Sequence, residues 1–146
     1  MTVRLPTATL VIDSNILLGA LRGYKTGKYI DRAGRIRRLT TTAEARREVE
    51  RVLARIDPGG TAAEAAAALF DALEIFADDE YAPALEPAAS RLTRAPASAN
   101  GSPRDAHILA LAWTLDADIW SHDRDFAGTG WPSWSSANLV AALADD

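Results

Sequence analysis

The stretch TATLVIDSNILLGAL, at Thr7–Leu21, joins a short apolar run to a helical pattern through one carboxylate. Ala8–Ile12 is uncharged and partly β-branched, which is typical of a strand buried on both faces of a parallel sheet. After Asp13, Ser14 and Asn15 can cap a helix, and leucine and isoleucine then recur at helical spacing. Asp13 is therefore predicted to lie at the edge where open α/β sheets bind ligands. On this stretch alone, a purely helix-capping role for Asp13 is an equal alternative.

The composition is that of an ordinary globular chain. Its 146 residues are 48% hydrophobic and 25% charged, and we expect one domain spanning residues 1–146. The absence of cysteine excludes disulfides, thiol nucleophiles and thiolate zinc sites. The N-terminus lacks an apolar signal core and no run approaches membrane-spanning length, so we expect a cytoplasmic protein with no membrane partner.

Basic residues are concentrated in one part of the chain. The segment Arg22–Arg55 holds eleven basic and four acidic residues, although the whole chain carries a net charge of −4. This concentration predicts a phosphate-binding surface, and a solvated face with helix-stabilising ion pairs is the alternative. The candidate nucleic-acid-binding cations are Lys25, Lys28, Arg32, Arg35, Arg37 and Arg38.

The segment Gly23–Gly34, GYKTGKYIDRAG, is rich in glycine and lysine and predicts a loop or mobile arm. Tyr24 and Tyr29 alternate with cations there, a pattern that suits single-stranded nucleic acid because bases stack on the rings while phosphates meet the cations. Anchoring of the loop to the core by these tyrosines is the equal alternative. Arg35–Thr41 then predicts a short second strand.

A capping box of Thr41 and Glu44 predicts a helix that runs to about Ile56. Glu48 lies at one margin of the apolar stripe of this helix, whereas Glu44 lies further out among arginines. Glu48 is therefore the better candidate for a site, and an ordinary ion pair with a neighbouring arginine is its alternative. The apolar stripe consists of Val49, Val52, Leu53 and Ile56.

The segment Thr61–Ser102 carries no evident chemistry and predicts scaffold. It contains two predicted helices, at Thr61–Ala77 and Ala84–Leu92, and a turn-rich connector at Pro96–Ser102. Further along the chain we predict a turn region at Gly128–Ser136, whose tryptophans fill the core, and a last helix at Ala137–Leu143.

A second acid opens a helix. Ser102 can serve as its N-cap, Pro103 suits its first position, and the sequence AHILALAWTL that follows is apolar nearly all round. Asp105 can be the acid of a capping box, but an unpaired carboxylate at the start of a buried helix is costly. Capping and metal binding are compatible, since a carboxylate has two oxygens.

A third acidic position follows a strand. Ala117–Ser121 predicts that strand, and Asp123 and Asp125 come directly after it, as Asp13 does after the first strand. The two histidines, His107 and His122, have no partner at metal-binding spacing, so we expect them to pack in the core or lie on the surface.

These acids have positional reasons to converge. Two carboxylates about 4 Å apart repel by roughly 4 kcal/mol at an effective dielectric constant near 20, so a cluster needs protonation or a cation. Oxygen ligands without Cys or His select hard ions, Mg²⁺ or Mn²⁺. Such an ion can activate water and neutralise a phosphate under attack.

Four segments resemble, in order, the four acidic motifs of PIN domains. They are LVIDSN at Leu10–Asn15, TTAEARREVERVL at Thr41–Leu53, RDAHILALA at Arg104–Ala112 and WSHDRDF at Trp120–Phe126. The chain resembles the single PIN domains of bacterial type II toxin–antitoxin ribonucleases. The resemblance implies a three-layer α/β/α sandwich with a short, mainly parallel central sheet. It also implies Mg²⁺- or Mn²⁺-dependent endonucleolytic cleavage of RNA, a homodimer and an antitoxin protein as candidate partner.

The resemblance also implies site residues. Asp125 becomes an auxiliary acid, Asn15 a polar support beside the first acid, and the six cations named above become the candidate RNA-binding residues. Glu44 stays an alternative to Glu48, because the second motif is the loosest. The implied catalytic quartet is Asp13, Glu48, Asp105 and Asp123, of which Asp13, Asp105 and Asp123 would hold the metal.

Two other functions fit parts of the sequence. A non-catalytic RNA-binding module on the same scaffold would use the basic segment and predicts salt-sensitive binding without turnover. A receiver-like phosphotransfer domain also places acids at strand ends. However, the two lysines, Lys25 and Lys28, both precede the later strands, and the chain has no Gly-rich phosphate loop.

Overall fold

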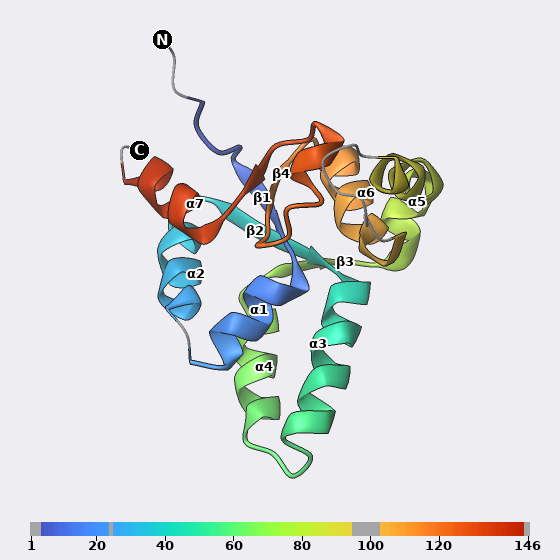
Figure 1. The fold of residues 1–146 in the computed structure, drawn as a ribbon. Coiled ribbons are helices and arrows are strands. Elements are labelled where there is room, and N and C mark those ends of the chain that lie inside the picture. Colours follow the sequence, from blue (N-terminus) through green and yellow to red (C-terminus); the bar gives the residue numbers. More distant parts are fainter. Residues whose placement is uncertain (1–3, 24, 95–102, 145–146) are drawn as a thin grey trace.

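Five parallel strands form one sheet in the order β3-β2-β1-β4-β5 (Figure 1). The computed structural model describes residues 4–23, 25–94 and 103–144, and the strands are counted within these ranges. The sheet confirms the expected α/β class, and it is parallel throughout rather than mainly parallel. The strands are β1 (Thr9–Ile12), β2 (Arg38–Thr42), β3 (Glu74–Phe76), β4 (Asp118–Trp120) and β5 (Ser133–Trp134).

Helices cover both faces of the sheet (Figure 1). Leu10 and Ile12 of β1 share a core with α1, α2, α3, α4 and α7, whereas Val11 points to the opposite face and packs with α5 and α6. None of the helices within the described ranges is long and apolar enough to cross a membrane. The helices are α1 (Ser14–Leu21), α2 (Thr26–Gly34), α3 (Ala43–Ile56), α4 (Ala62–Asp71), α5 (Asp78–Thr93), α6 (Ala106–Leu115) and α7 (Ser136–Leu143).

The strand order reverses beside β1, because β2 pairs with one edge of β1 and β4 with the other. Such a switch point opens a crevice outside the carboxyl ends of the two strands. Ile12 and Trp120 are paired at the ends of β1 and β4, and the Asp13 N–H donates to the Trp120 carbonyl at 3.0 Å. This register sets the residues that follow β1 beside those that follow β4.

The prediction of a loop over residues 23–34 is wrong for most of that segment, which forms α2. Thr26, Ile30 and Ala33 recur at helical spacing and are buried, so packing against the core outweighs the low helix propensity of two glycines. Tyr29 packs against the same core, which supports the anchoring alternative for this residue. Tyr24 lies outside the described residues.

The start of α3 differs from the prediction by one residue. β2 continues to Thr42, and the Thr42 Oγ1 accepts the Ala45 N–H at 2.9 Å, so Thr42 is the N-cap rather than Thr41. The Thr41 hydroxyl instead donates to the Ile12 carbonyl at 2.7 Å and ties β2 to β1.

Two short strands fall where the sequence predicted other structure. Thr61–Ala77 is not one helix, because α4 ends at Asp71 and Glu74–Phe76 forms β3. The predicted turn region at 128–136 contains β5 as well as the 3₁₀ turn η2 (Ala127–Thr129). The other boundaries also move: α5 begins at Asp78 instead of Ala84, and α7 begins at Ser136. The connector at 96–102 lies outside the described residues.

Asp118 ties the N-terminal segment to the sheet. Its buried carboxylate accepts both Nη groups of Arg4 at 2.7 Å and the indole N–H of Trp134 at 2.8 Å. Burial acts to raise the pKa of Asp118, but these hydrogen bonds outweigh it and hold the pKa below its ordinary value. Trp131 donates its indole N–H to the Ala117 carbonyl at 2.8 Å, so both tryptophans pack structurally, as predicted.

Candidate active site

Asp13 and Asp123 are connected through one serine at the carboxyl ends of β1 and β4. Asp13 is 4% exposed, and its Oδ1 accepts the Ser14 N–H at 2.7 Å, so it is also the N-cap of α1. Its Oδ2 accepts the Ser121 hydroxyl at 2.7 Å. The Ser121 Oγ in turn accepts the Asp123 N–H at 2.9 Å. Capping and site roles of Asp13 thus coexist on its two oxygens.

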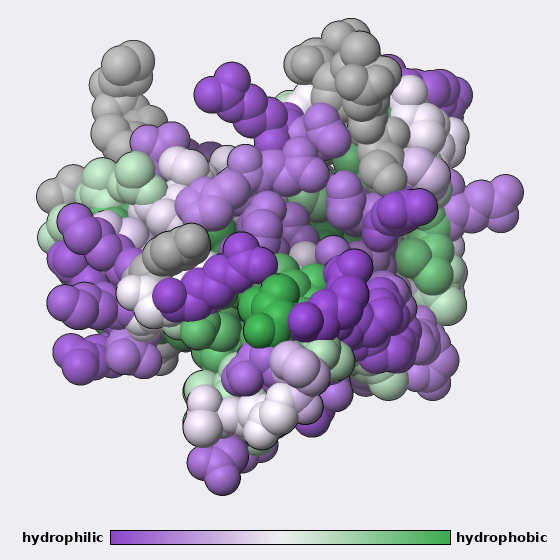
Figure 2. Space-filling view, turned by 60° about the horizontal axis from the view of Figure 1, so that its bottom comes forward, coloured by the Kyte–Doolittle hydropathy of each residue, from purple (hydrophilic) through white to green (hydrophobic). Residues whose placement is uncertain are grey.

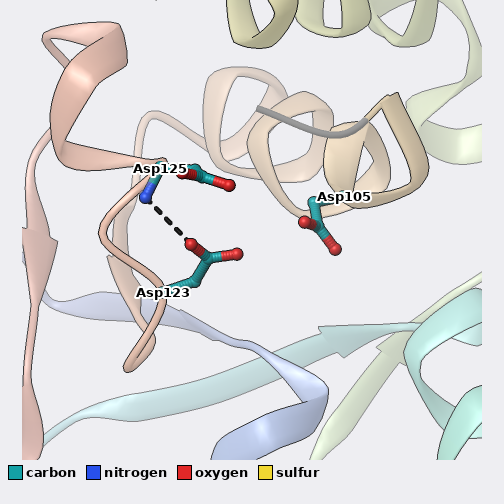
Figure 3. Close-up of side chains that lie close together, drawn as sticks. All are labelled: Asp105, Asp123 and Asp125. Atoms are coloured by element: carbon teal, nitrogen blue, oxygen red, sulfur yellow. Dashed lines mark hydrogen bonds between the residues drawn. The ribbon is translucent and has the colours of Figure 1, made fainter. Parts of the chain in front are cut away.

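Asp105, Asp123 and Asp125 form the acidic cluster of this site (Figure 3). One carboxylate oxygen from each lies within 4.8 Å of those of the other two. Asp105 ends the 3₁₀ turn η1 (Pro103–Asp105) directly before α6, while Asp123 and Asp125 belong to the loop after β4. The Asp125 N–H donates to the Asp123 Oδ1 at 2.9 Å and holds that loop in shape.

Asp13 is not one of the three clustered carboxylates, but it interacts electrostatically with two of them, Asp105 and Asp123. Burial, followed by the charges of Asp13, Asp123 and Glu48, raises the pKa of Asp105 to about 7. Burial also raises the pKa of Asp13 to about 6, with smaller contributions from Glu48 and Asp123 and with opposing hydrogen bonds from Ser121 and Ser14. Burial is thus the main cause of both shifts, and repulsion between the carboxylates adds to it.

The structure distinguishes Glu48 from Glu44. Glu44 accepts hydrogen bonds from Arg47 at 2.6 Å and from Arg51 at 3.2 Å, and the Arg47 bond is the main reason that its pKa is lowered. Glu48 forms neither a hydrogen bond nor an ion pair with any residue that the structure describes. Its charge instead acts on Asp13 and Asp105.

Asn15, in the first turn of α1, contacts the loop after β4. Its Nδ2 donates to the Ser121 hydroxyl and its Oδ1 accepts the His122 N–H, both at 3.4 Å. The role of Asn15 as a polar support beside Asp13 stays a prediction. His122 is exposed, whereas His107 is buried and its Nδ1 lies 2.8 Å from the Thr42 Oγ1.

A cleft of about 860 Å³ opens beside the acids. Glu48 and Asp105 line it from α3 and from the turn before α6, and Tyr81 lines it from α5. Three arginines also line this cleft: Arg47, Arg51 and Arg104. Acids that can act on one phosphate therefore line the same cleft as cations that can bind neighbouring phosphates.

The six cations predicted to bind RNA lie elsewhere. None of them, all within the described ranges, lines the cleft that holds Glu48 and Asp105. Arg38 opens β2 at the amino edge of the sheet and pairs with Glu74, and Arg37 donates to the Pro6 carbonyl at 3.2 Å. Arg35 precedes them in the chain, and Lys25, Lys28 and Arg32 belong to the segment around α2.

Two features of the site were missed from the sequence. Ser121 bridges Asp13 to Asp123, and nothing marks a serine at a strand end as a bridge until the register of β1 and β4 is known. The arginines on α3 could have been found, because Glu44, Arg47, Glu48 and Arg51 follow one another at spacings of three, one and three and so share one helix face.

The donor set fits a hard divalent cation. Its members are all carboxylates, they are close together, and burial and mutual repulsion raise the pKa values of Asp13 and Asp105. A divalent cation relieves such repulsion, and carboxylate oxygen is the ligand that Mg²⁺ and Mn²⁺ prefer.

A family model described as the PIN domain matches residues 11–144 of this chain. The matched segment begins within β1 and contains all the strands and helices described above that follow it. No curated protein is similar enough in sequence to match.

Solved structures of low sequence identity share the fold. VapBC2 from Rickettsia felis, bound to a DNA fragment from its promoter, is 10% identical with a TM-score of 0.71, over 87% of this chain and 98% of that one. FitAcB from Neisseria gonorrhoeae is 14% identical with a TM-score of 0.67, over 89% and 99%. Mycobacterium tuberculosis VapC20, a toxin that cleaves the sarcin-ricin loop, is 21% identical with a TM-score of 0.63, over 84% and 95%.

Proposed function

Because the chain belongs to the PIN domain family, we propose that it is a metal-dependent endoribonuclease. The observation that carries this proposal is the convergence of Asp105, Asp123 and Asp125 beside the buried Asp13. These acids come from distant parts of the chain, and the fold has a switch point at that place.

The residues proposed to hold Mg²⁺ or Mn²⁺ are Asp13, Asp105 and Asp123, with Asp125 completing the acidic cluster. A bound divalent ion would supply positive charge to the phosphate under attack and lower the pKa of a water molecule. Ser121 donates to Asp13, and Asn15 hydrogen-bonds to Ser121 and to the His122 N–H, so both residues orient this part of the site.

We assign Glu48 rather than Glu44 as the fourth acid. Glu48 faces the cleft with no cation paired to it in the described structure, so its carboxylate is available to accept a proton from the attacking water. Glu44 is engaged by Arg47 and Arg51. In-line attack would break one P–O bond of the RNA backbone and leave a phosphate end and a hydroxyl end.

Asp123→Asn and Asp13→Asn test this proposal. We expect either change to lower Mn²⁺-stimulated cleavage of RNA by roughly a hundredfold or more, because each removes a carboxylate that is proposed to hold the cation acting on the phosphate. The measurement is cleavage of a labelled RNA, with circular dichroism to show that the variants fold. Glu64→Gln, on the exposed surface of α4, is the matched control and should cleave like the unmodified protein.

Full cleavage by either aspartate variant would overturn the nuclease assignment. Salt-sensitive RNA binding without turnover, and indifferent to Asp13, would instead support a non-catalytic RNA-binding module.

Its biological setting is proposed to be a toxin–antitoxin pair in the cytoplasm. The similar structures include a toxin that cleaves RNA, which supports this class. In Figure 2, hydrophilic side chains surround a hydrophobic area near the centre of one face, a feature that suits a protein partner such as an antitoxin or a second copy in a homodimer. Rescue of growth by co-expression of a small neighbouring reading frame tests the pairing.

A further inference from the structure

Helix α3 presents three different faces to its surroundings. Ala45, Val49 and Leu53 are buried in the protein body. Arg46 and Glu50 line a second groove, against α4, where the Arg46 guanidinium stacks 5.2 Å from the centre of the Phe70 ring. The remaining face consists of Glu44, Arg47, Glu48 and Arg51, and it lines the cleft beside the acidic cluster.

Arg47 spans the rim of this cleft. Its Nη2 donates to the Glu44 Oε2 at 2.6 Å on its own helix and to the Asp78 Oδ1 at 2.8 Å at the start of α5. Arg51 reaches the other oxygen of Glu44 at 3.2 Å. Two guanidinium groups are thus held at the cleft by two acids, a short way along α3 from Glu48.

We propose that Arg47 and Arg51 bind RNA phosphates next to the one that is cleaved, with Arg47 exchanging its acidic partners for a phosphate. This inference rests on the proposed nuclease function and names the phosphate-binding residues of that same site.

The exchange is energetically accessible because the resting ion pairs are exposed. The side chains of Arg47 and Arg51 are 45% and 61% exposed, and those of Glu44 and Asp78 are 36% and 57% exposed. Ion pairs at such positions contribute little to stability, whereas a guanidinium can bind a phosphate through two parallel hydrogen bonds. The hydrogen bonds that Arg47 donates to Asp78 and Glu44 also raise the pKa of Arg47, so it is a cation throughout.

The positions of other basic residues make Arg47 and Arg51 the better candidates for binding phosphates near the acids. Arg38 and Arg37 lie at the amino edge of the sheet, on the far side from the carboxyl ends that carry the acids. Arg47 and Arg51 share the cleft with Glu48 and Asp105, so a strand that places one phosphate at the acids passes them.

The test compares Arg47→Gln with Arg46→Gln. These neighbours on α3 are 45% and 47% exposed and each pairs with a glutamate of the same helix, but they face different grooves. Both changes are made in the Asp123→Asn protein, and binding of a fluorescein-labelled, mixed-sequence 12-nucleotide RNA is followed by anisotropy in EDTA. We expect Arg47→Gln to weaken binding about tenfold and to flatten the salt dependence, and Arg46→Gln to leave both unchanged.

A second comparison probes the exchange itself. Asp78→Asn removes a competitor of the phosphate and should tighten RNA binding, whereas Glu50→Gln makes the same charge change beside Arg46 and should not. Thermal melting of each variant separates binding from folding. If Arg47→Gln lowers the melting temperature but binds RNA like Arg46→Gln, the arginine is structural and the inference is wrong. That outcome leaves the nuclease proposal intact, since cleavage by the unmodified protein is measured separately.

Discussion

At the scale of single residues, Asp105 combines two unfavourable conditions, partial burial and like-charged neighbours. Together they raise its pKa to about 7, against about 4 in an unfolded chain. Between these values the folded protein binds a proton that the unfolded chain does not. Asp105 therefore opposes folding by an amount that grows as the pH rises from about 4 to about 7 and is largest above pH 7.

Asp105→Asn is therefore expected to stabilise the metal-free protein. In EDTA at pH 8 the gain should be on the order of 1–2 kcal/mol, after allowance for partial exposure, and it should fade as the pH is lowered towards 4. Urea unfolding across this range measures it. Asp31→Asn, on the exposed side of α2, is the control, and an equal gain there would mean that net charge alone is responsible.

The acids of the site were predictable one by one, whereas their partners were not. Asp13 and Asp123 each follow an apolar strand, and Asp105 opens an apolar helix, so local sequence marks all three. The helix pattern already favoured Glu48 over Glu44. What it could not show is Asp78 of α5, which shares Arg47 with Glu44.

At the scale of elements, the start of α3 depends on one hydroxyl. The Thr42 Oγ1 accepts the Ala45 N–H, so its own proton can be donated to the Nδ1 of the buried His107 on α6. Burial lowers the pKa of His107 to about 4, so the ring is neutral at pH 7 and can accept this bond. The contact between Thr42 and His107 therefore joins α3, which carries Glu48, to α6, which follows Asp105.

Thr42→Val should destabilise the protein by about 2 kcal/mol, because a helix cap is lost and a buried imidazole nitrogen loses its donor. Thr42→Ser keeps the hydroxyl and is the matched control. Since the pKa of His107 is lowered on folding, both proteins should also lose stability as the pH falls from about 6.5 towards 4. Equal unfolding midpoints for the two variants would show that the hydroxyl is unimportant.

The helices α3 and α6 and the strands β1, β2 and β4 were predictable, whereas β3, β5 and α2 were not. The patterns of α3 and α6 span several turns, and both helices were found with small boundary errors. β3 and β5 have three and two residues, too few for a period to be visible, and pairing with an existing sheet edge stabilises them. The helix α2 contains two glycines and forms because its Ile30 and Ala33 pack on the core.

At the scale of the whole molecule, the order of strands places the acids together. The sequence predicts parallel strands but contains no signal for which strands are neighbours, so the switch point beside β1 appears in the structure alone. Once β4 pairs with β1, the loop with Asp123 and Asp125 must lie beside Asp13. A cation bound there would link segments from both halves of the chain.

Such a link predicts that divalent ions stabilise the entire fold. Mn²⁺ at a hundredfold excess over its dissociation constant should raise the free energy of unfolding by about 2.7 kcal/mol, compared with protein in EDTA. Thermal or urea unfolding of the unmodified protein and of Asp123→Asn provides the measurement, and the variant should show a much smaller gain. The same gain in both proteins would place the ion away from the cluster.

Each carboxylate oxygen of Asp13 accepts a hydrogen bond, and this has a practical consequence for capturing a substrate complex. One oxygen caps the N-terminus of α1 and the other accepts a hydrogen bond from the Ser121 hydroxyl. An amide at this position retains an acceptor while it abolishes the negative charge, whereas a methyl group would strip the first turn of α1 and the serine of their acceptor together. The asparagine form is thus the better choice for crystallising an intact RNA on this protein, since inactivity and loosening of the scaffold would then not be confused.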